Sequence, residues 1–521
     1  MALVLIHNPH FHKVANALTY AKDTPGVNGH RHNDYPKAIV LLIGVLSRVC
    51  RSLPKAEAML RTPATWMEIR KHWHMAVEAG VAGPNQPSEL PLKPITAAQW
   101  RYMVERIIDE PERFTSIENA FTEAATDLAL ELGYFQNGST SNPDISSCLF
   151  SDGTEIRSQY RCYVEPVPDP DNPDTLRLAA IDPGRGHKVR AYLVEIDGVW
   201  RAVDPKTGEV LKKMPVDVES LTSSKYGPKQ AAYNVVPVST RSSESHSRVT
   251  LGVGMDVSDS EEAKTTVALL KRVVSGRLQG SVQAMITDGI LRGVHQETLF
   301  KELGIITVNK VAAAVSKEEE MRNVLDEKGK KIKTLPIRRA THQRSDGATC
   351  PHLLEARDGA LVEVDYDQDG SHLRVVGKPE RIQVKRAKEL TNNGSQYRIS
   401  VGYIVKCRHG DFQVWISPHK GSDKVPDNIA ENLRVFPEGD PVFTRLYGAG
   451  RNTSEGGNAH YKNTYPHKRA QAVGRIPILL DVHLYFIFDN AKTWYFSGGW
   501  RTVDPMVHGN GALASVLEMA S

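Results

Sequence analysis

Two aspartates stand at the ends of short apolar runs that are typical of β-strands. Asp152 follows the run CLFS and precedes Gly153, and Asp288 follows the run QAMIT and precedes Gly289. Asp-Gly is a common turn dipeptide, so a plain turn is one interpretation of each. The other interpretation is a metal site, because functional sites in open α/β sheets form outside the carboxyl ends of the strands. If the two strands are neighbours, the two carboxylates can share a metal ion.

A third acidic residue, Glu455, lies in the stretch GAGRNTSEGGNAHYKNTYPHKRA, which is rich in basic residues. A carboxylate in this setting can bind a metal ion while the neighbouring cations bind phosphates. The alternative is structural, because a glutamate in the first turn of a helix interacts favourably with the helix dipole. The candidate phosphate-binding residues around Glu455 are Arg451, Lys462, Lys468 and Arg469.

A second basic segment, DEKGKKIKTLPIRRATHQR, lies in a region of strands and turns. A charge run of this kind is either a solvated face or a surface that contacts phosphates. The net charge of +4 is only mildly basic, so it permits a nucleic-acid partner without demanding one. The residues that we expect to face DNA are Lys330, Lys331, Lys333, Arg338 and Arg339.

The chain has 521 residues, which is too long for one ordinary hydrophobic core, so several domains are expected. The N-terminal region, 1–140, has the apolar spacing of helices. Short strands alternate with helices over 145–310, which predicts an α/β fold with a mixed sheet. Residues 311–440 are rich in strand and turn patterns, and 441–521 are expected to be helical from near Asn452.

Composition and cysteine usage indicate the compartment. The chain is 40% hydrophobic and 24% charged, as in soluble globular proteins. It begins without a secretory signal pattern, and the apolar run AIVLLIGVL is too short to span a bilayer, so we expect a cytoplasmic protein without a membrane partner. Five cysteines without a CxxC pair indicate a reducing compartment. Cys350 and His352, with His342 nearby, match no standard zinc-finger spacing, so no metal is expected there.

In order, these motifs resemble the DDE transposases of bacterial insertion sequences. The resemblance rests on a strand followed by DGT, a strand ending in TDG, a helix followed by LGIITVN, and the pattern R-x-x-x-E in a late helix. It extends in pattern over about 145–500, and the segment SLPKAEAMLRTPATWMEIRKHW resembles the leading domain of such proteins. The family's Tyr-Arg-Glu-Lys signature is matched only in part, by Arg451, Glu455 and Lys462.

The resemblance implies a ribonuclease-H-like catalytic core with an N-terminal helical domain and a β-rich insertion. It implies that Asp152, Asp288 and Glu455 are the catalytic metal ligands, and that two Mg²⁺ ions, replaceable by Mn²⁺, serve DNA cleavage and the joining of 3′ ends to target DNA. The implied partners are the terminal inverted repeats of a transposon, target DNA and a second copy of the chain, in a nucleoid-associated homodimer on DNA. Two alternatives stay open: a domesticated DNA-binding protein that does not cut, and a metal-dependent nuclease on the same fold.

Two further aspartates compete for the catalytic role. Asp182 ends the apolar run LAAID, but the Pro-Gly that follows favours a turn. Asp256 is interpreted as the end of the third strand of the core. Arg292 and His295 follow Asp288 closely, and the sequence does not distinguish contact with a scissile phosphate from simple solvation.

Overall fold

The computed structural model describes residues 1–20, 35–157, 163–182, 188–211, 232–256, 262–311, 321–391, 394–419, 429–465, 470, 472 and 474–499. The chain divides into two compact units, and each is built from segments that are far apart in the sequence. The first unit comprises 1–133, 153–265 and 456–521, and the second comprises 134–152 and 266–455. The fold is mixed α/β, as expected.

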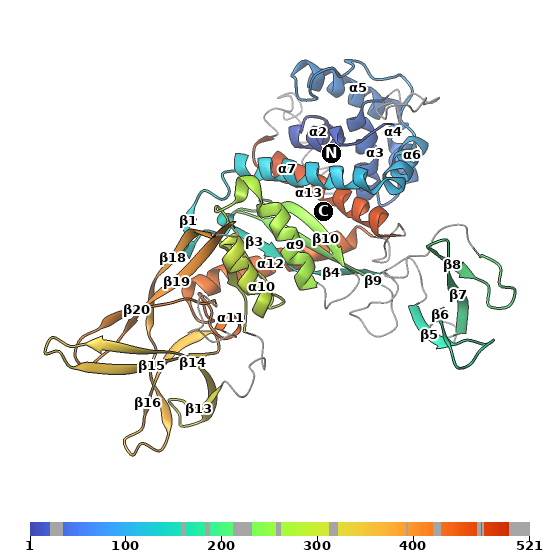
Figure 1. The fold of residues 1–521 in the computed structure, drawn as a ribbon. Coiled ribbons are helices and arrows are strands. Elements are labelled where there is room, and N and C mark those ends of the chain that lie inside the picture. Colours follow the sequence, from blue (N-terminus) through green and yellow to red (C-terminus); the bar gives the residue numbers. More distant parts are fainter. Residues whose placement is uncertain are drawn as a thin grey trace. The chain divides into compact units, whose positions relative to one another are not determined.

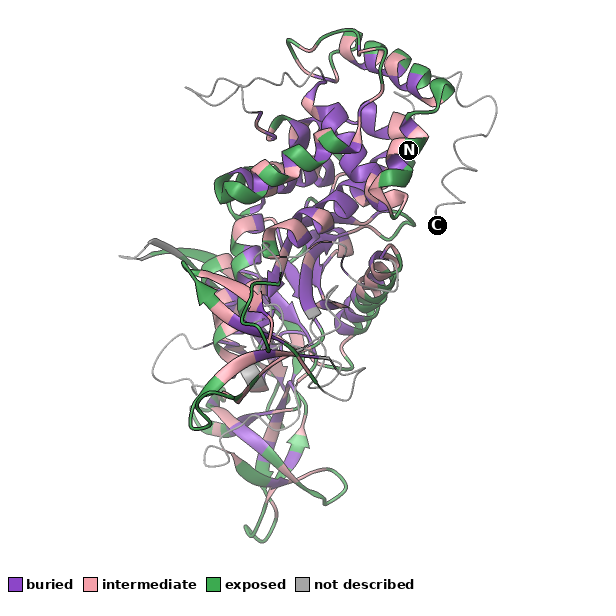
Figure 2. Cartoon of the chain, turned by 90° about the vertical axis from the view of Figure 1, so that its right-hand side faces the viewer, coloured by how far each residue is buried: buried purple, intermediate pink, exposed green. Residues whose placement is uncertain are grey.

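Helices dominate the first unit (Figure 1). They are α1 (Ala2–Ile6), α2 (Pro9–Asn16), α3 (Lys37–Val49), α4 (Leu53–Leu60), α5 (Pro63–Glu78), α6 (Ala97–Asp109), α7 (Pro111–Glu131) and α13 (Arg475–Phe496). The apolar run of α3 is almost wholly buried, as the sequence predicts. Helix α13 packs against α3 and α7, and 15 of its 22 residues are buried, at positions on nearly every side of the helix. Figure 2 colours the ribbon by the burial of each residue. A helix that is apolar all round belongs in a core rather than at a surface.

Two sets of antiparallel strands complete the first unit. In one, β9 (Ala232–Thr240) pairs with both β4 (Thr154–Arg157) and β10 (Val249–Asp256), and α7 and α13 pack on β10. The other is a meander of four strands in chain order: β5 (Tyr163–Pro168), β6 (Leu176–Asp182), β7 (Lys188–Ile196) and β8 (Val199–Val203). The sequence predicts two of these strands, LRLAAID and KVRAYLVEI, as members of the mixed core sheet. The structure instead places them, as β6 and β7, in a separate sheet with a small apolar core of its own.

Helix α9 (Glu262–Val274) begins in the first unit and continues into the second. At its start the buried carboxylate of Glu262 accepts hydrogen bonds from the backbone N–H of Gly153 at 2.8 Å and from the side chain of Asn234 at 3.1 Å. These bonds tie the beginning of β4 to α9 and β9.

Three parallel strands lie at the centre of the second unit. Strand β11 (Ala284–Ile286) pairs with β3 (Cys148–Ser151) on one side and with β12 (Ile306–Val308) on the other. The connection from β11 to β12 runs through α10 (Gly293–Thr298) and one π-helical turn (Leu299–Leu303). The strands are buried along their whole length, as parallel strands usually are.

The β-rich insertion in the second unit has two parts. Its first part is a closed barrel of β13 (Arg322–Leu325), β14 (Lys331–Gln343), β15 (Thr349–Arg357), β16 (Ala360–Tyr366) and β17 (Leu373–Gly377). Its second part is an antiparallel sheet of β18 (Glu380–Thr391), β19 (Gly394–Val405) and β20 (Phe412–Ile416). One connected apolar cluster joins residues of the barrel, this sheet and the three parallel strands.

Short elements complete the second unit: β1 (Gly138–Ser139), β2 (Asn142–Pro143), two 3-10 turns (Ile145–Ser147 and Gly276–Leu278) and α11 (Ile429–Asn432). Helix α12 (Pro441–Asn463) follows and extends across the boundary into the first unit. The final helical region therefore starts at Pro441 and not near Asn452. Among the described helices, none is long and apolar enough to cross a membrane.

Candidate active site

Asp152 and Asp288 end two neighbouring parallel strands of the second unit. Strands β3 and β11 pair with Phe150 opposite Ile286. Two residues further along, the same register places Asp152 and Asp288 side by side, just beyond the ends of the two strands. Both side chains line one small pocket. Their local sequences predict strand ends, and the pairing of the two strands brings these ends together.

The turn after β11 gives Asp288 its position. The N–H of Thr287 donates to the carbonyl of Val308 at 3.3 Å, so the pairing with β12 continues one residue beyond the strand. The next residue, Gly289, has a φ of +123°, a backbone conformation that residues with a side chain rarely adopt. The chain turns sharply there, and the Asp288 side chain is left exposed at the strand end. The Arg292 guanidinium donates to the carbonyl of Gly289 at 3.3 Å.

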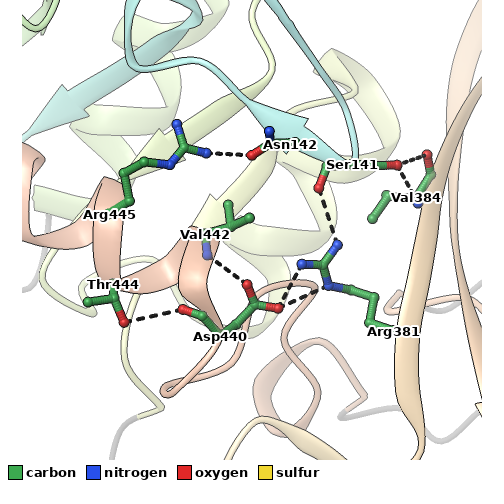
Figure 3. Close-up of polar contacts among 8 residues, drawn as sticks. All are labelled: Ser141, Asn142, Arg381, Val384, Asp440, Val442, Thr444 and Arg445. Atoms are coloured by element: carbon green, nitrogen blue, oxygen red, sulfur yellow. Dashed lines mark hydrogen bonds and ion pairs between the residues drawn. The ribbon is translucent and has the colours of Figure 1, made fainter.

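The third wall of the pocket is α12, and Asp440 sets where this helix begins (Figure 3). The Asp440 carboxylate accepts a hydrogen bond from the N–H of Val442 at 2.8 Å, which caps the first turn. Pro441 at the first helical position lacks the N–H that would otherwise need a partner. The same carboxylate accepts from the Arg381 guanidinium on β18, with the nearest nitrogen at 2.7 Å.

A second anchor lies one turn along α12 (Figure 3). The Arg445 guanidinium donates to the Asn142 side chain at 2.6 Å and to the carbonyl of Pro143 at 3.0 Å. Arg381 also donates to the carbonyl of Ser141 at 3.2 Å. The short β1–β2 hairpin and β18 therefore hold the N-terminal half of α12 from two sides.

Gly450 brings α12 close to β11. A Cβ atom on Gly450 would lie 2.7 Å from the Cγ2 of Ile286, which is closer than carbon atoms pack. Glycine permits this approach because it has no side chain. The helix can therefore place its next turn, with Arg451, Ser454 and Glu455, on the pocket.

Tyr447, Arg451 and Glu455 are four residues apart, so they share one face of α12. The Arg451 Nε donates to Glu455 Oε1 at 2.7 Å, and both side chains are more than half exposed. The Glu455 carboxylate, together with the Tyr447 hydroxyl, raises the pKa of Arg451 above its ordinary value. Lys310 brings another cation to this face, with its Nζ 5.8 Å from the centre of the Tyr447 ring.

Glu455 lies in the middle of a helix of 23 residues, not in a first turn. The structural interpretation of Glu455, a favourable contact with a helix N-terminus, is therefore wrong. Two explanations remain for its place on the pocket wall: the ion pair with Arg451, or a role as a ligand in the pocket. An exposed ion pair is weak, because water solvates both charges, so it leaves the carboxylate able to take another partner.

The pocket has a volume of about 60 Å³. The hydroxyls of Ser151 and Thr287 are buried in its wall without a hydrogen-bond partner among the described residues. Oxygen atoms from three carboxylates and two hydroxyls form the donor set that Mg²⁺ and Mn²⁺ prefer. Among the described residues, no three His, Cys, Asp or Glu side chains already stand in the arrangement of a metal centre. The residues that line the pocket are Ser151, Asp152, Ile286, Thr287, Asp288, Tyr447, Gly450, Arg451, Ser454 and Glu455.

The competing aspartates lie elsewhere. Asp182 ends β6 in the four-stranded meander, and Asp256 is buried at the end of β10; both belong to the first unit. Neither lines the pocket described above. Arg292 is exposed directly after the Asp288 turn, whereas His295 is half-buried in α10.

The basic residues that are predicted to face DNA differ in their exposure, and two of them lie outside the described residues. The five basic residues of the insertion are all exposed, on β14 or in the turn before it, and Arg338 donates to the carbonyl of Trp415 at 3.0 Å. Lys462 is half-buried near the end of α12, and Lys468 and Arg469 lie outside the described residues. Their contact with DNA stays a prediction.

Sequence reasoning missed Ser151, Thr287, Tyr447 and Gly450. For Tyr447 a signal was present, since its spacing of four from Arg451 and of eight from Glu455 is that of one helix face. Comparison with protein-family models, curated proteins and solved structures finds no match. The functional argument therefore depends on this chain's own residues.

Proposed function

We propose that this chain is a DDE-type DNA transposase, which cuts DNA at transposon ends and joins the 3′ ends to target DNA. The observation that carries the proposal is that Asp152, Asp288 and Glu455, three carboxylates from distant segments, line one small pocket. Two of them follow adjacent parallel strands, and the third lies on a helix packed against one of these strands.

The order of strands along the chain supports a ribonuclease-H-like core. Strands β3 and β4 count as one first strand interrupted at Asp152, and β9 and β10 follow as an antiparallel pair. Strand β11 is then the fourth strand and β12 the fifth, and β3, β11 and β12 are parallel in that spatial order. Counted in this way, Asp152 would belong to the first strand and Asp288 would directly follow the fourth, which are the positions that the resemblance implies.

The residues fit a divalent metal, and Asp152, Asp288 and Glu455 would hold it. A bound Mg²⁺ pair supplies activation of the attacking oxygen and stabilisation of the leaving oxygen at phosphorus. The three carboxylates alone repel a DNA phosphate. Arg451 lines the pocket, Lys310 lies beside Tyr447, and Arg292 follows the Asp288 turn. These three cations would orient the phosphate groups on either side of the cut. Glu455 would hold the metal with the carboxylate oxygen that Arg451 does not contact, or would release Arg451 and free its guanidinium for a phosphate.

Replacement of Asp288 by asparagine tests the proposal. The variant keeps the shape of the side chain and removes the charge, so binding to a duplex that carries the element's own ends should survive. Nicking and strand transfer should fall by orders of magnitude in Mg²⁺, and Asp152→Asn and Glu455→Gln should behave alike. A mobility shift measures binding, and a denaturing gel measures nicked and joined products on the same duplex.

The matched control is Asp358→Asn, an aspartate of the same unit whose side chain is 88% exposed in a barrel turn. It should bind and nick like the wild type. Nicking by Asp288→Asn at the wild-type rate would remove Asp288 from the catalytic set. A wild type that binds but never nicks in Mg²⁺ or Mn²⁺ would favour the domesticated DNA-binding protein, and nicking without joined products would favour the nuclease.

A further inference from the structure

Four potential metal ligands from two strands and a loop converge in the β-rich insertion. His342 is near the end of β14, directly opposite Cys350 on β15. His352 is two residues beyond Cys350 and therefore on the same face of that strand. Cys407 lies in the connection between β19 and β20, 55 residues beyond His352 in the sequence.

The sulfur of Cys407 is the point where these side chains meet. His342, His352 and Cys350 each contact the Cys407 thiol. The ring of Phe412, at the start of β20, packs against both imidazoles, at 4.8 Å from His342 and 4.9 Å from His352 between ring centres. The His342 ring is stacked almost parallel to it, at 2°. The aromatic ring therefore restricts both histidines to orientations that keep them beside Cys407.

Glu363 holds one side of the cluster. The His352 Nδ1 lies 2.5 Å from Glu363 Oε1 on the neighbouring strand β16. The other nitrogen of this ring, Nε2, and the Nδ1 of His342 are buried and make no well-aligned hydrogen bond, although both rings contact the Cys407 sulfur. Histidines that ligate a metal commonly donate their second ring N–H to a carboxylate, which orients the ring and leaves the other nitrogen for the ion. His352 and Glu363 have this relationship.

We propose that the insertion binds a structural zinc ion. Two thiolates and two imidazoles are a donor set that favours tetrahedral zinc over Mg²⁺, which prefers oxygen. In the structure the contacts centre on the Cys407 sulfur and not on a shared point, in keeping with the absence of a preformed metal centre among the described residues. To bind zinc, the donor atoms of these side chains would have to turn towards one point, and the two cysteines, which Phe412 does not hold, would make most of this movement. The four ligands are His342, Cys350, His352 and Cys407.

Such an ion would join the two parts of the insertion. Three of the ligands belong to the β14–β15 hairpin of the barrel, and Cys407 belongs to the loop between two strands of the three-stranded sheet. Zinc bound across them would hold the barrel and the sheet in one arrangement. Because zinc binding to a folded site adds directly to folding stability, removal of the ion should loosen this part of the chain. The inference does not depend on the proposed catalysis.

Metal analysis of the full-length protein tests this proposal. We expect one zinc ion per chain after purification from zinc-supplemented cells and dialysis against zinc-free buffer. Replacement of the zinc by Co²⁺ should produce intense visible bands and sulfur-to-cobalt charge-transfer bands, which report thiolate ligands in a tetrahedral site. Cys407→Ser and Cys350→Ser should each lose the zinc. Cys50→Ser and His372→Ala, which change a cysteine and a histidine elsewhere, should keep it.

The spectrum of the wild type decides the question even if the cysteine variants aggregate, because the charge-transfer bands arise only from cobalt bound to sulfur. A wild type with zinc at background level and without these bands would overturn the proposal. So would Cys407→Ser that retains a full equivalent of zinc. A disulfide between Cys350 and Cys407, found by thiol titration and mass spectrometry in protein purified under reducing conditions, would also overturn it.

Discussion

Replacement of Gly450 by alanine tests whether α12 must lie close against β11 for the pocket to form. The added Cβ would lie 2.7 Å from the Cγ2 of Ile286, 3.2 Å from its Cβ and 3.3 Å from its Cδ1. Carbon atoms pack at about 3.5–4.0 Å, so the helix would have to retreat by about 1 Å. Gly448 in the same helix provides a matched control, because a Cβ there would meet nothing within 4 Å.

The magnitude follows from two opposing effects. Alanine in a helix interior is favoured over glycine by about 0.8–1.0 kcal/mol, so Gly448→Ala should raise the free energy of unfolding by about that amount. In Gly450→Ala the same gain is opposed by overpacking, which costs about 1–3 kcal/mol. The two variants should therefore differ in stability by about 1–3 kcal/mol. Helix propensity cancels in this comparison and leaves the effect of close packing.

Two assays separate stability from function. Chemical denaturation measures the free energy of unfolding of each variant, and a nicking assay in Mg²⁺ measures activity at a temperature where both are folded. A shift of about 1 Å in a catalytic group can lower a rate by as much as about 100-fold. We therefore expect a large loss of nicking in Gly450→Ala and little change in Gly448→Ala. Equal stability and equal nicking in the two variants would refute the idea that the contact with Ile286 sets the place of Glu455.

Two other perturbations probe the elements around the pocket. Asp440→Ala removes the cap of α12 and leaves the partly buried Arg381 without its carboxylate. Chemical denaturation should therefore show that the free energy of unfolding falls by about 1–3 kcal/mol. Replacement of the nearby exposed Glu438 by alanine is the control and should change this free energy little. A smaller loss than in Glu438→Ala would contradict the assigned role of the cap. Replacement of the five exposed basic residues of the insertion by alanine should make the DNA affinity depend less steeply on salt, because fewer counterions are released on binding. A salt titration with an unchanged slope would mean that these residues form only a solvated face. These five are Lys330, Lys331, Lys333, Arg338 and Arg339.

Local sequence predicted the two strand-end aspartates but could not predict that their strands pair. Asp152 and Asp288 are 136 residues apart in the chain, and pairing between such distant strands depends on packing that no local pattern records. The start of α12 was misplaced for a related reason. Glycines at 448, 450, 456 and 457 obscure the helical pattern, while the true start depends on the cap at Asp440 and on Arg381 from a distant strand.

The meander of β5 to β8 shows the same limit in another form. A strand pattern in the sequence does not specify which sheet the strand joins. From the sequence alone, Asp182 is therefore an alternative to Asp152 as the first catalytic aspartate, because both residues end predicted strands. The structure separates them: β6 pairs with the antiparallel β5 and β7, whereas β3 pairs with the parallel β11, which Asp288 follows.

For the histidine and cysteine cluster, the spacing of the residues along the sequence predicts no metal site, whereas their arrangement in the structure leads us to propose one. Zinc fingers are recognised by ligands a few residues apart because one short loop supplies each pair. Here His342 and Cys350 face each other only because β14 and β15 pair in one register, and Cys407 reaches them from another hairpin. A shift of one residue in that register would turn either His342 or Cys350 to the opposite face and break the set. The spacing of ligands along a chain can therefore exclude a finger, but it cannot exclude a site assembled by a sheet, and the acidic pocket was assembled in the same way.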